Sequence, residues 1–153
     1  MKYRLLALLV AIAMTVPMLG THAYAQGPII VMLDGGPLPF DVPPMVVEGR
    51  TMVPMRVIFE ALGATVSWDD ATRTITATRD GLVVRATVGD RVIHVNNQRV
   101  TMDVAPVIVN GRTLVPVRFV SEALDAEVDW YAAGNTVFIT SPRGDSFVSA
   151  EEQ

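Results

Sequence analysis

The sequence predicts an α+β fold of antiparallel β-hairpins with one short helix per repeat, and three observations support this prediction. First, Asp41–Thr78 aligns without a gap on Asp103–Thr140, 62 residues later, and 19 of the 38 positions are identical. Second, an X-Gly dipeptide lies between short apolar runs in both copies, Asn110-Gly111 in the second, which is a hairpin signal. Third, Pro54 and Pro116 each precede a run of helical apolar spacing. A unit of about 60 residues with one short helix cannot easily bury its own core, so we expect two tandem repeats packed as one domain.

The first 25 residues are typical of a secretory signal peptide. Lys2 and Arg4 precede the apolar run Leu5–Val16, and Ala23-Tyr24-Ala25 supplies the small residues that a signal peptidase reads. The apolar run is short for a bilayer span of about 20 residues. We therefore expect cleavage before Gln26, no membrane span after leader cleavage, and a secreted or extracellular cell-surface protein. An uncleaved membrane anchor is the alternative.

Each repeat is expected to begin with a hairpin. In the first repeat, strands at Ile29–Leu33 and Leu38–Asp41 flank the turn-rich tetrad Asp34–Pro37. In the second repeat, the corresponding strands are Val92–Val95 and Val100–Met102.

A second hairpin leads into the helix. Met45–Val47 and Arg50–Val53 flank the turn Glu48-Gly49. The helix is expected over Pro54–Leu62, because a proline in the first turn has no N–H to leave unbonded. Its apolar face is predicted to comprise Val57, Ile58, Ala61 and Leu62.

A glycine stop and a third hairpin complete the repeat. Gly63 is expected to end the helix in the left-handed conformation, and Asp125, which occupies that place in the second repeat, should be slightly strained. Thr65–Trp68 and Arg73–Thr78 are predicted to form the last hairpin, with polar and apolar residues alternating along its second strand. A strand at Leu82–Val88 then leads into the second repeat.

These elements define one domain over residues 28–141, with repeats at about 29–80 and 91–141. Residues 142–153 contain proline, glycine and acidic residues, and we expect a disordered tail. The tail includes Arg143-Gly144-Asp145, an integrin-adhesion tripeptide, but so short a match usually arises by chance.

Composition excludes several classes of function. The chain has no Cys, which excludes disulfides and lipid attachment at a leader cysteine. The formal net charge is −4, and after leader removal Arg supplies every basic side chain. An acidic chain without a basic cluster argues against nucleic acid or anionic lipid as a partner. One of the two His, His22, lies in the leader, and His94 alone cannot form a His-rich copper or zinc site, so we expect no metal and no cofactor.

Two charged pairs sit at equivalent helix positions and are candidate binding residues. Arg56 and Glu60 are four residues apart, as are Arg118 and Glu122. The interpretation that we favour is an i,i+4 ion pair, or an arginine tying its helix to a neighbouring carbonyl. The functional alternative is a pair of related sites for an acidic group on a glycan or peptide.

Trp68 and Trp130 end matching strands and are candidate binding residues too. Exposed aromatic rings can provide a platform for stacking sugars. We favour a place in the core, because equivalent Trp residues in a small duplicated fold are more often buried.

Three acidic residues beside these Trp residues raise the possibility of hydrolysis. Asp69, Asp70 and Asp129 could in principle form the carboxylate pair of a glycosidase, which needs two groups at a defined separation. Asp69-Asp70 followed by Ala-Thr is also an ordinary turn sequence, and we favour the turn. The second repeat has Tyr131-Ala132 at the equivalent positions, so the acidic pair is not duplicated.

The repeated residues resemble a known family. The segments VTMDVAPVI at Val100–Ile108 and VNGRTLVPVRFVSEALDAEVDW at Val109–Trp130, with VEGRTMVPMRVIFEALGATVSWDD in the first repeat, resemble the copper amine oxidase-like N-terminal domain, also called the stalk domain. The resemblance covers nearly all of the mature chain. It implies an antiparallel sheet curled around a helix, in secreted or envelope proteins of bacteria, as an accessory module. The copper and the quinone of amine oxidases belong to a separate catalytic domain, so oxidase activity is not implied.

We therefore predict a secreted or envelope-associated, non-enzymatic binding or spacer module whose partner is a cell-wall polymer or a surface protein. The first alternative is a secreted hydrolase that uses Asp/Glu carboxylates. The second is a structural protein that self-associates through exposed sheet edges as a homo-oligomer.

Overall fold

The computed structural model describes residues 27–142, so the expected signal peptide, the Arg-Gly-Asp tripeptide and all but the first residue of the expected tail lie outside the described residues. The elements, in order, are β1 (Ile30–Leu33), β2 (Gly36–Pro37), β3 (Met45–Val47), β4 (Arg50–Pro54), α1 (Met55–Ala61), β5 (Thr65–Asp69), β6 (Thr74–Arg79), β7 (Leu82–Thr87), β8 (Val92–Val95), β9 (Gln98–Thr101), β10 (Val107–Val109), β11 (Arg112–Pro116), α2 (Val117–Leu124), β12 (Glu127–Tyr131), a 3-10 turn (Ala132–Gly134) and β13 (Thr136–Thr140). The described chain is thus mostly β-sheet with two α-helices, which is compatible with the predicted α+β class.

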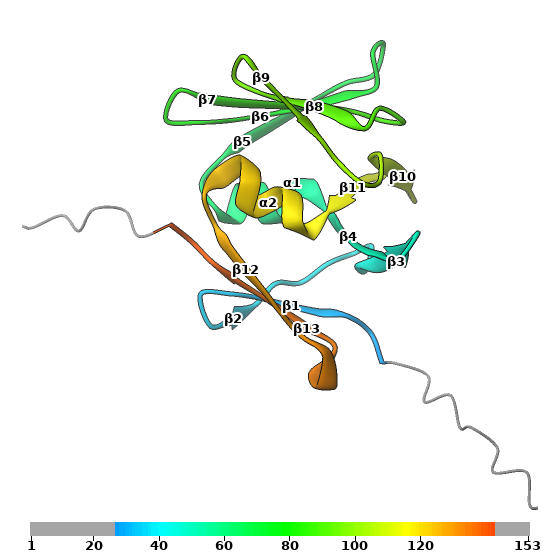
Figure 1. The fold of residues 1–153 in the computed structure, drawn as a ribbon, viewed down its shortest axis with the longest axis vertical. Coiled ribbons are helices and arrows are strands. Elements are labelled where there is room, and N and C mark those ends of the chain that lie inside the picture. The colour runs from blue at the N-terminus through cyan, green and yellow to red at the C-terminus, as the bar shows by residue number, and fades with distance from the viewer. Residues whose placement is uncertain (1–26, 143–153) are drawn as a thin grey trace, which may run out of the picture.

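The strands form three sheets around the helices (Figure 1). The terminal sheet has the order β12-β13-β1-β2, the central sheet β10-β11-β4-β3, and the meander sheet β5-β6-β7-β8-β9. In Figure 1, the meander sheet lies at the upper end of the long axis and the terminal sheet at the lower end. Helices α1 and α2 lie between these two sheets, and the central sheet lies at their side.

Both predicted X-Gly hairpins form, because their turn residues tolerate the left-handed conformation. Glu48 and Gly49 have φ of 48° and 75°, and Asn110 and Gly111 have φ of 48° and 76°. Positive φ at both central residues matches the twist of the flanking strands. Each turn therefore joins two adjacent strands of the central sheet.

The first hairpin and the sheet type differ from the prediction. Leu38–Asp41 is not a strand; β1 pairs instead with Gly36–Pro37, around a turn at Asp34-Gly35. Prolines at this point of the chain cannot donate to a strand ladder, which shortens the hairpin. The terminal sheet is also not purely antiparallel, because β1 pairs in parallel with β13, from Ile30↔Thr136 to Leu33↔Ile139.

The helices begin and end close to the predicted residues, but their buried face differs. Pro54 precedes α1 with an extended ψ of 115°, so it is the last strand residue rather than the first helical one. The buried positions are Met55, Ile58, Phe59 and Leu62, whereas the predicted core residue Ala61 is exposed. The four buried positions have the spacing i, i+3, i+4, i+7 of an ordinary amphipathic helix, so the apolar stripe begins at Met55 and leaves Ala61 outside it. Asp125 takes the left-handed conformation after α2, with φ of 55°.

Contacts between the two repeats come in equivalent pairs. Strands β4 and β11 pair antiparallel at the middle of the central sheet, where Val53 lies opposite Val115, its counterpart 62 residues later. Helix α1 contacts β11 as well as β5, and α2 contacts β4 as well as β12. Each helix therefore packs on a strand of the other repeat.

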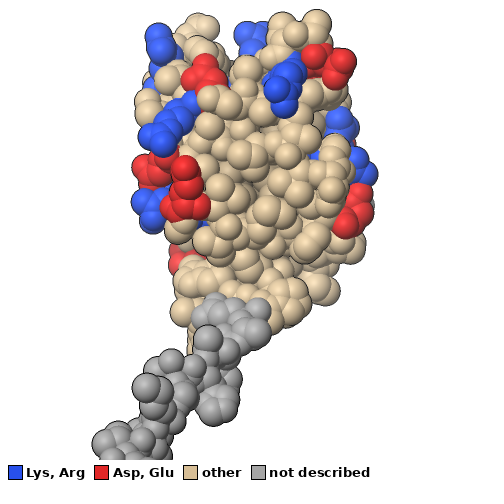
Figure 2. All heavy atoms as spheres, turned by 90° about the vertical axis from the view of Figure 1, so that its right-hand side faces the viewer, with Lys and Arg blue, Asp and Glu red and all other residues tan. Residues whose placement is uncertain are grey.

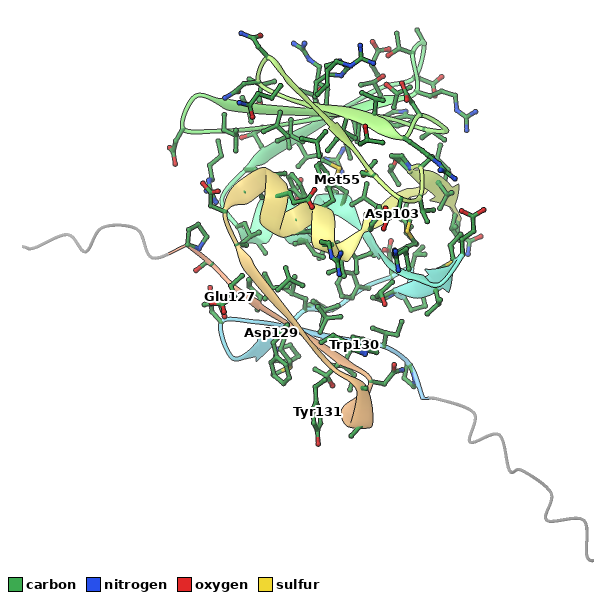
Figure 3. All side chains as sticks on the ribbon, viewed as in Figure 1. Met55, Asp103, Glu127, Asp129, Trp130 and Tyr131 are labelled. Atoms are coloured by element: carbon green, nitrogen blue, oxygen red, sulfur yellow. The ribbon has the colours of Figure 1, made fainter. Side chains whose placement is uncertain are left out.

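Two apolar clusters occupy the interior. The larger one contains buried residues from α1, α2 and the inner faces of the terminal and meander sheets. Met55, labelled in Figure 3, lies in the middle of it. Phe59 and Phe119 stack there with ring centroids 5.9 Å apart, joining the two helices. The smaller cluster, under the central sheet, comprises Val42, Met52, Val104 and Leu114.

Charged residues are unevenly distributed over the surface. Figure 2 shows them toward the upper end, which is the end of the meander sheet, and along the two flanks. The lower part of that view is uncharged where the described residues are visible.

Candidate functional site

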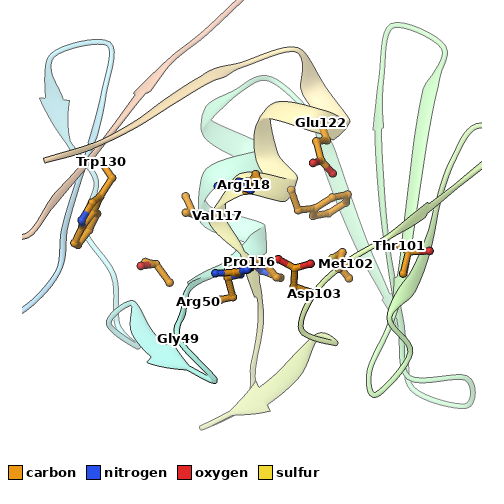
Figure 4. Close-up of a pocket in the computed structure, with 12 residues that line it drawn as sticks. Gly49, Arg50, Thr101, Met102, Asp103, Pro116, Val117, Arg118, Glu122 and Trp130 are labelled. Carbon is orange, nitrogen blue, oxygen red and sulfur yellow. Dashed lines mark hydrogen bonds and ion pairs between the residues drawn. The ribbon is translucent and has the colours of Figure 1, made fainter. Parts of the chain in front are cut away.

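Two surface recesses lie beside the points where β4 leads into α1 and where β11 leads into α2. The Trp130 recess has a volume of about 370 Å³ and is lined by Arg50, Asp103, Val117, Arg118, Glu122 and Trp130, among others (Figure 4). The Trp68 recess has a volume of about 360 Å³, and Arg56, Val57, Trp68, Asp70, Ile108 and Arg112 contribute to it. Seven of the residues lining the Trp68 recess lie 62 positions from a residue lining the Trp130 recess. Each recess thus combines a helix start from one repeat with a hairpin from the other.

Reciprocal ion pairs join the repeats at the recess walls. Arg50 donates from Nε to Asp103 Oδ2 at 2.8 Å, and Arg112 donates from Nε to Asp41 Oδ2 at 2.9 Å. Arg50 and Arg112 are equivalent residues, as are Asp41 and Asp103. The hydrogen bond from Arg112 lowers the pKa of Asp41, and the carboxylate raises the pKa of Arg112. Both groups are therefore charged at neutral pH, and Arg50 and Arg112 each bind a carboxylate of the other repeat.

The candidate Arg56 has the architectural contacts that we favoured from the sequence. Its Nη1 donates to Glu60 Oε1 at 3.2 Å and to the carbonyl of Val66 at 3.1 Å. The side chain thus makes the i,i+4 ion pair and also ties α1 to β5. The equivalent Arg118 is exposed, and with Glu122 it lines the Trp130 recess.

The two tryptophans differ in exposure, so the expectation that both are core residues is wrong for one of them. Trp68 is half-buried, packs on the main cluster and donates from Nε1 to Asp70 Oδ1 at 3.4 Å. Trp130 is 47% exposed. The second repeat has Ala132 where the first has Asp70, so the side chain that holds the Trp68 indole has no counterpart beside Trp130. Figure 4 shows Trp130 across the recess from Asp103, with Val117 and Arg118 between them.

The structure does not gather the three acidic residues of the hydrolase hypothesis. Asp69 Oδ1 accepts hydrogen bonds from the backbone N–H groups of Ala71 and Thr72, which makes it a turn residue as the sequence indicated. Asp70 lies by Trp68 at the end of the meander sheet, and Asp129 belongs to the terminal sheet. Within residues 27–142, no three acidic, His or Cys side chains lie close enough together to hold a metal ion.

The outer face of the terminal sheet is an apolar surface that we did not predict. Phe138 is 42% exposed between the buried Val137 and Ile139, so it points away from the core. Tyr131 and Ile30, also exposed, both pair with Thr136. Figure 3 shows Tyr131 projecting from the lower end of the molecule. The alternation in Val-Phe-Ile could have revealed Phe138 as an outward residue, but only once the sheet was known to be covered on one side.

Comparison with known proteins places the chain in a family. The architecture is that of a small, mostly β module. Residues 32–139 match the model of the copper amine oxidase N-terminal domain, and the chain belongs to that family. The predicted membership is therefore confirmed. Within copper amine oxidases this domain is separate from the catalytic one, so the match indicates a non-catalytic module.

One curated relative is a protein of Brevibacillus choshinensis named "Protease inhibitor". It is 35% identical over 82 residues, which is 54% of this chain and 25% of that protein. The match therefore covers about a quarter of the relative's length. Neither helix in the described part of the chain has the length and apolarity needed to cross a bilayer.

Proposed function

We propose that the protein is a non-enzymatic binding and spacer module of a secreted or envelope-associated chain, and that its partner is a cell-wall polymer. The observation that carries this proposal is the Trp130 recess, where a half-exposed indole adjoins hydrogen-bonding side chains. In this proposal the two repeats act as one rigid body. The reciprocal Arg50–Asp103 and Arg112–Asp41 pairs support that view.

The charges of the Trp130 recess favour an uncharged, hydroxyl-rich ring as ligand. Its two arginines, Arg50 and Arg118, are balanced by Asp103 and Glu122. Arg50 uses Nε and Nη2 for Asp103, so an acidic ligand would have to compete with a carboxylate already bound. A sugar ring can instead stack its C–H face on Trp130 and exchange hydroxyl hydrogen bonds with the paired side chains. We therefore propose an uncharged sugar as the ligand, in place of the acidic group on a glycan or peptide that the sequence suggested.

Substitution of Trp130 tests the proposal. We expect Trp130→Ala to weaken retention of the mature protein on purified, delipidated peptidoglycan at least about tenfold, because central aromatic residues dominate binding energy. Tyr131→Ala is the matched control: the neighbouring aromatic is 56% exposed but faces away from the recess, so retention should stay unchanged. Co-sedimentation measures both. Equal losses in the two variants, or no retention of the unaltered protein, would refute glycan binding at this recess.

A surface protein is the other partner that we considered. The name of the Brevibacillus choshinensis relative describes a protein that acts on other proteins. If the unaltered protein does not bind peptidoglycan and instead captures one defined envelope protein, the partner is a protein.

Self-association is a second candidate function, and the apolar outer face of the terminal sheet favours it. Exposed contiguous apolar residues mark interaction sites. The equivalent positions of the meander sheet supply polar replacements that the same strand positions accept, since Phe138 corresponds to Thr76 and Tyr131 to Asp69. If the face joins two copies, analytical ultracentrifugation should find a dimer that the double variant Phe138→Thr/Tyr131→Asp converts to a monomer. A monomeric unaltered protein at high concentration would exclude this function.

A further inference from the structure

The outer face of the meander sheet carries a row of polar side chains that the sequence does not reveal. Strand pairing places Ser67 opposite Thr76, Thr76 opposite Arg85, Arg85 opposite His94, and His94 opposite Arg99. The row therefore crosses all five strands, and at a strand spacing of about 4.8 Å it extends roughly 19 Å. Two of its five members, Arg85 and Arg99, are cationic, and His94 lies between them. We call it the cationic row.

The row faces solvent. Arg85, His94 and Arg99 are exposed, whereas the strand neighbours Val84, Ala86 and Ile93 are fully buried. Side chains alternate between the two faces of a strand, so the row lies on the side away from the helices.

Among the described residues, the two arginines of the row, like Arg73 and Arg91 at strand ends, lack the ion-pair partners that three other arginines have. Arg50, Arg56 and Arg112 are ion-paired. Within residues 27–142, by contrast, the side chains of Arg85 and Arg99, which flank His94, make no hydrogen bond or ion pair. Arg85 and Arg99 both lie opposite His94, so their guanidinium groups stand on the same face, two strand spacings (about 10 Å) apart. Two exposed guanidinium groups on one face, both available for charge-assisted hydrogen bonds, point to an anionic ligand.

The equivalent row of the terminal sheet has a different chemistry. Asp129, Phe138, Met32 and Pro37 take the places of Ser67, Thr76, His94 and Arg99. The cationic row is thus a property of one end of the molecule and not of the repeated architecture.

The residues on the outer face of the meander sheet indicate which kind of polyanion fits it. Trp68 is the one Phe, Tyr or Trp in the five strands, and its partner Ile75 is buried, so the indole lies on the inner face. Single-stranded nucleic acids require aromatic platforms for their bases. The exposed large apolar residues of the described chain all lie outside the meander sheet, whereas docking on a lipid surface would need apolar insertion.

We propose that the cationic row binds a linear phosphodiester polymer of polyol units, the kind of anionic chain that carries neither bases nor acyl groups. Arg85 and Arg99 pair with phosphate groups along the chain, and the hydroxyls of Ser67 and Thr76 donate to phosphate oxygens. The site is independent of the Trp130 recess, so either assignment can fail alone.

The test is binding of the mature protein to purified poly(glycerol phosphate) at several salt concentrations. The double variant Arg85→Gln/Arg99→Gln should weaken binding by roughly tenfold to a hundredfold and reduce the slope of log K against log salt by about two. The control Arg73→Gln/Arg91→Gln removes the same charge at strand ends, away from the row, and should change binding less than threefold. Both melting temperatures should equal that of the unaltered protein, which excludes unfolding as the cause.

Three results would overturn the proposal. Equal losses in the two double variants would indicate diffuse electrostatic attraction without a site. Tighter binding to oligo(dT), polyglutamate or anionic vesicles than to poly(glycerol phosphate) would assign another ligand. Absence of binding to poly(glycerol phosphate) at low salt would leave the row without the proposed role. Trp130→Ala should leave this binding unchanged, which separates the row from the recess.

Discussion

Phe59→Ala is expected to lower the free energy of unfolding by about 3–5 kcal/mol, the largest effect of a single substitution that we predict. Phe59 is fully buried, and its ring stacks on that of Phe119 at a centroid distance of 5.9 Å. Truncation removes a large apolar surface from the core and also the contact between α1 and α2. Because the helices lie between two sheets, the walls of the resulting cavity cannot easily collapse. Chemical denaturation followed by far-UV circular dichroism measures the loss.

The control for this prediction is an aromatic residue on the surface. Tyr131→Ala removes a ring that is 56% exposed, so the free energy of unfolding should change by less than about 0.5 kcal/mol. A loss below about 1 kcal/mol in Phe59→Ala would contradict the stacked helix pair. With a typical total stability of about 5–15 kcal/mol, the expected loss is large enough to measure without ambiguity.

The predicted features that the structure contains are those decided by local chemistry. Glu48-Gly49 and Asn110-Gly111 adopt positive φ because of the conformational preferences of the turn residues themselves. Both hairpins could therefore be predicted from the turn dipeptide and the apolar residues beside it. Likewise Gly63, with φ of 86°, ends the first helix where the left-handed conformation is needed. In both cases the decisive contacts join residues close together in the sequence.

The features that could not be predicted depend on residues far apart in the chain. The parallel pairing of β1 with β13 joins Ile30 to Thr136, and no local pattern specifies it. Trp68 and Trp130 both lie on edge strands, but only Trp68 has an Asp70 to accept from its indole, because Ala132 stands at the equivalent position beside Trp130. The cationic row depends on the register of β7, β8 and β9. This register places Arg85 and Arg99 opposite His94, although the three residues are separated in the sequence.

One side chain outside the repeated pattern joins the two helices at their ends. Arg79 donates from Nη1 to the carbonyl of Leu62 at 2.9 Å and from Nη2 to that of Leu124 at 3.3 Å. Leu62 caps α1 and Leu124 is the last residue of α2. Terminal carbonyls of a helix lack partners within the helix and carry partial negative charge, so a guanidinium there is favourable. The second repeat has Ser141 at the equivalent position, so one arginine serves both helices.

Arg79→Met is therefore expected to lower the free energy of unfolding by about 2–4 kcal/mol. Methionine keeps the apolar stem but loses two charge-assisted hydrogen bonds, and it leaves the carbonyls of Leu62 and Leu124 without their donor. Only 20% of the Arg79 side chain is exposed, so water cannot fully replace the lost donors. Arg79→Lys should recover only part of the lost stability. Its ammonium group can donate to one carbonyl, but it cannot reach both carbonyls as a forked guanidinium does. Arg73→Met, at an exposed hairpin end, should change stability by less than about 0.5 kcal/mol. Equal stabilities of the Arg79→Met and Arg73→Met variants in urea would show that the bridge between the helix ends contributes nothing to folding.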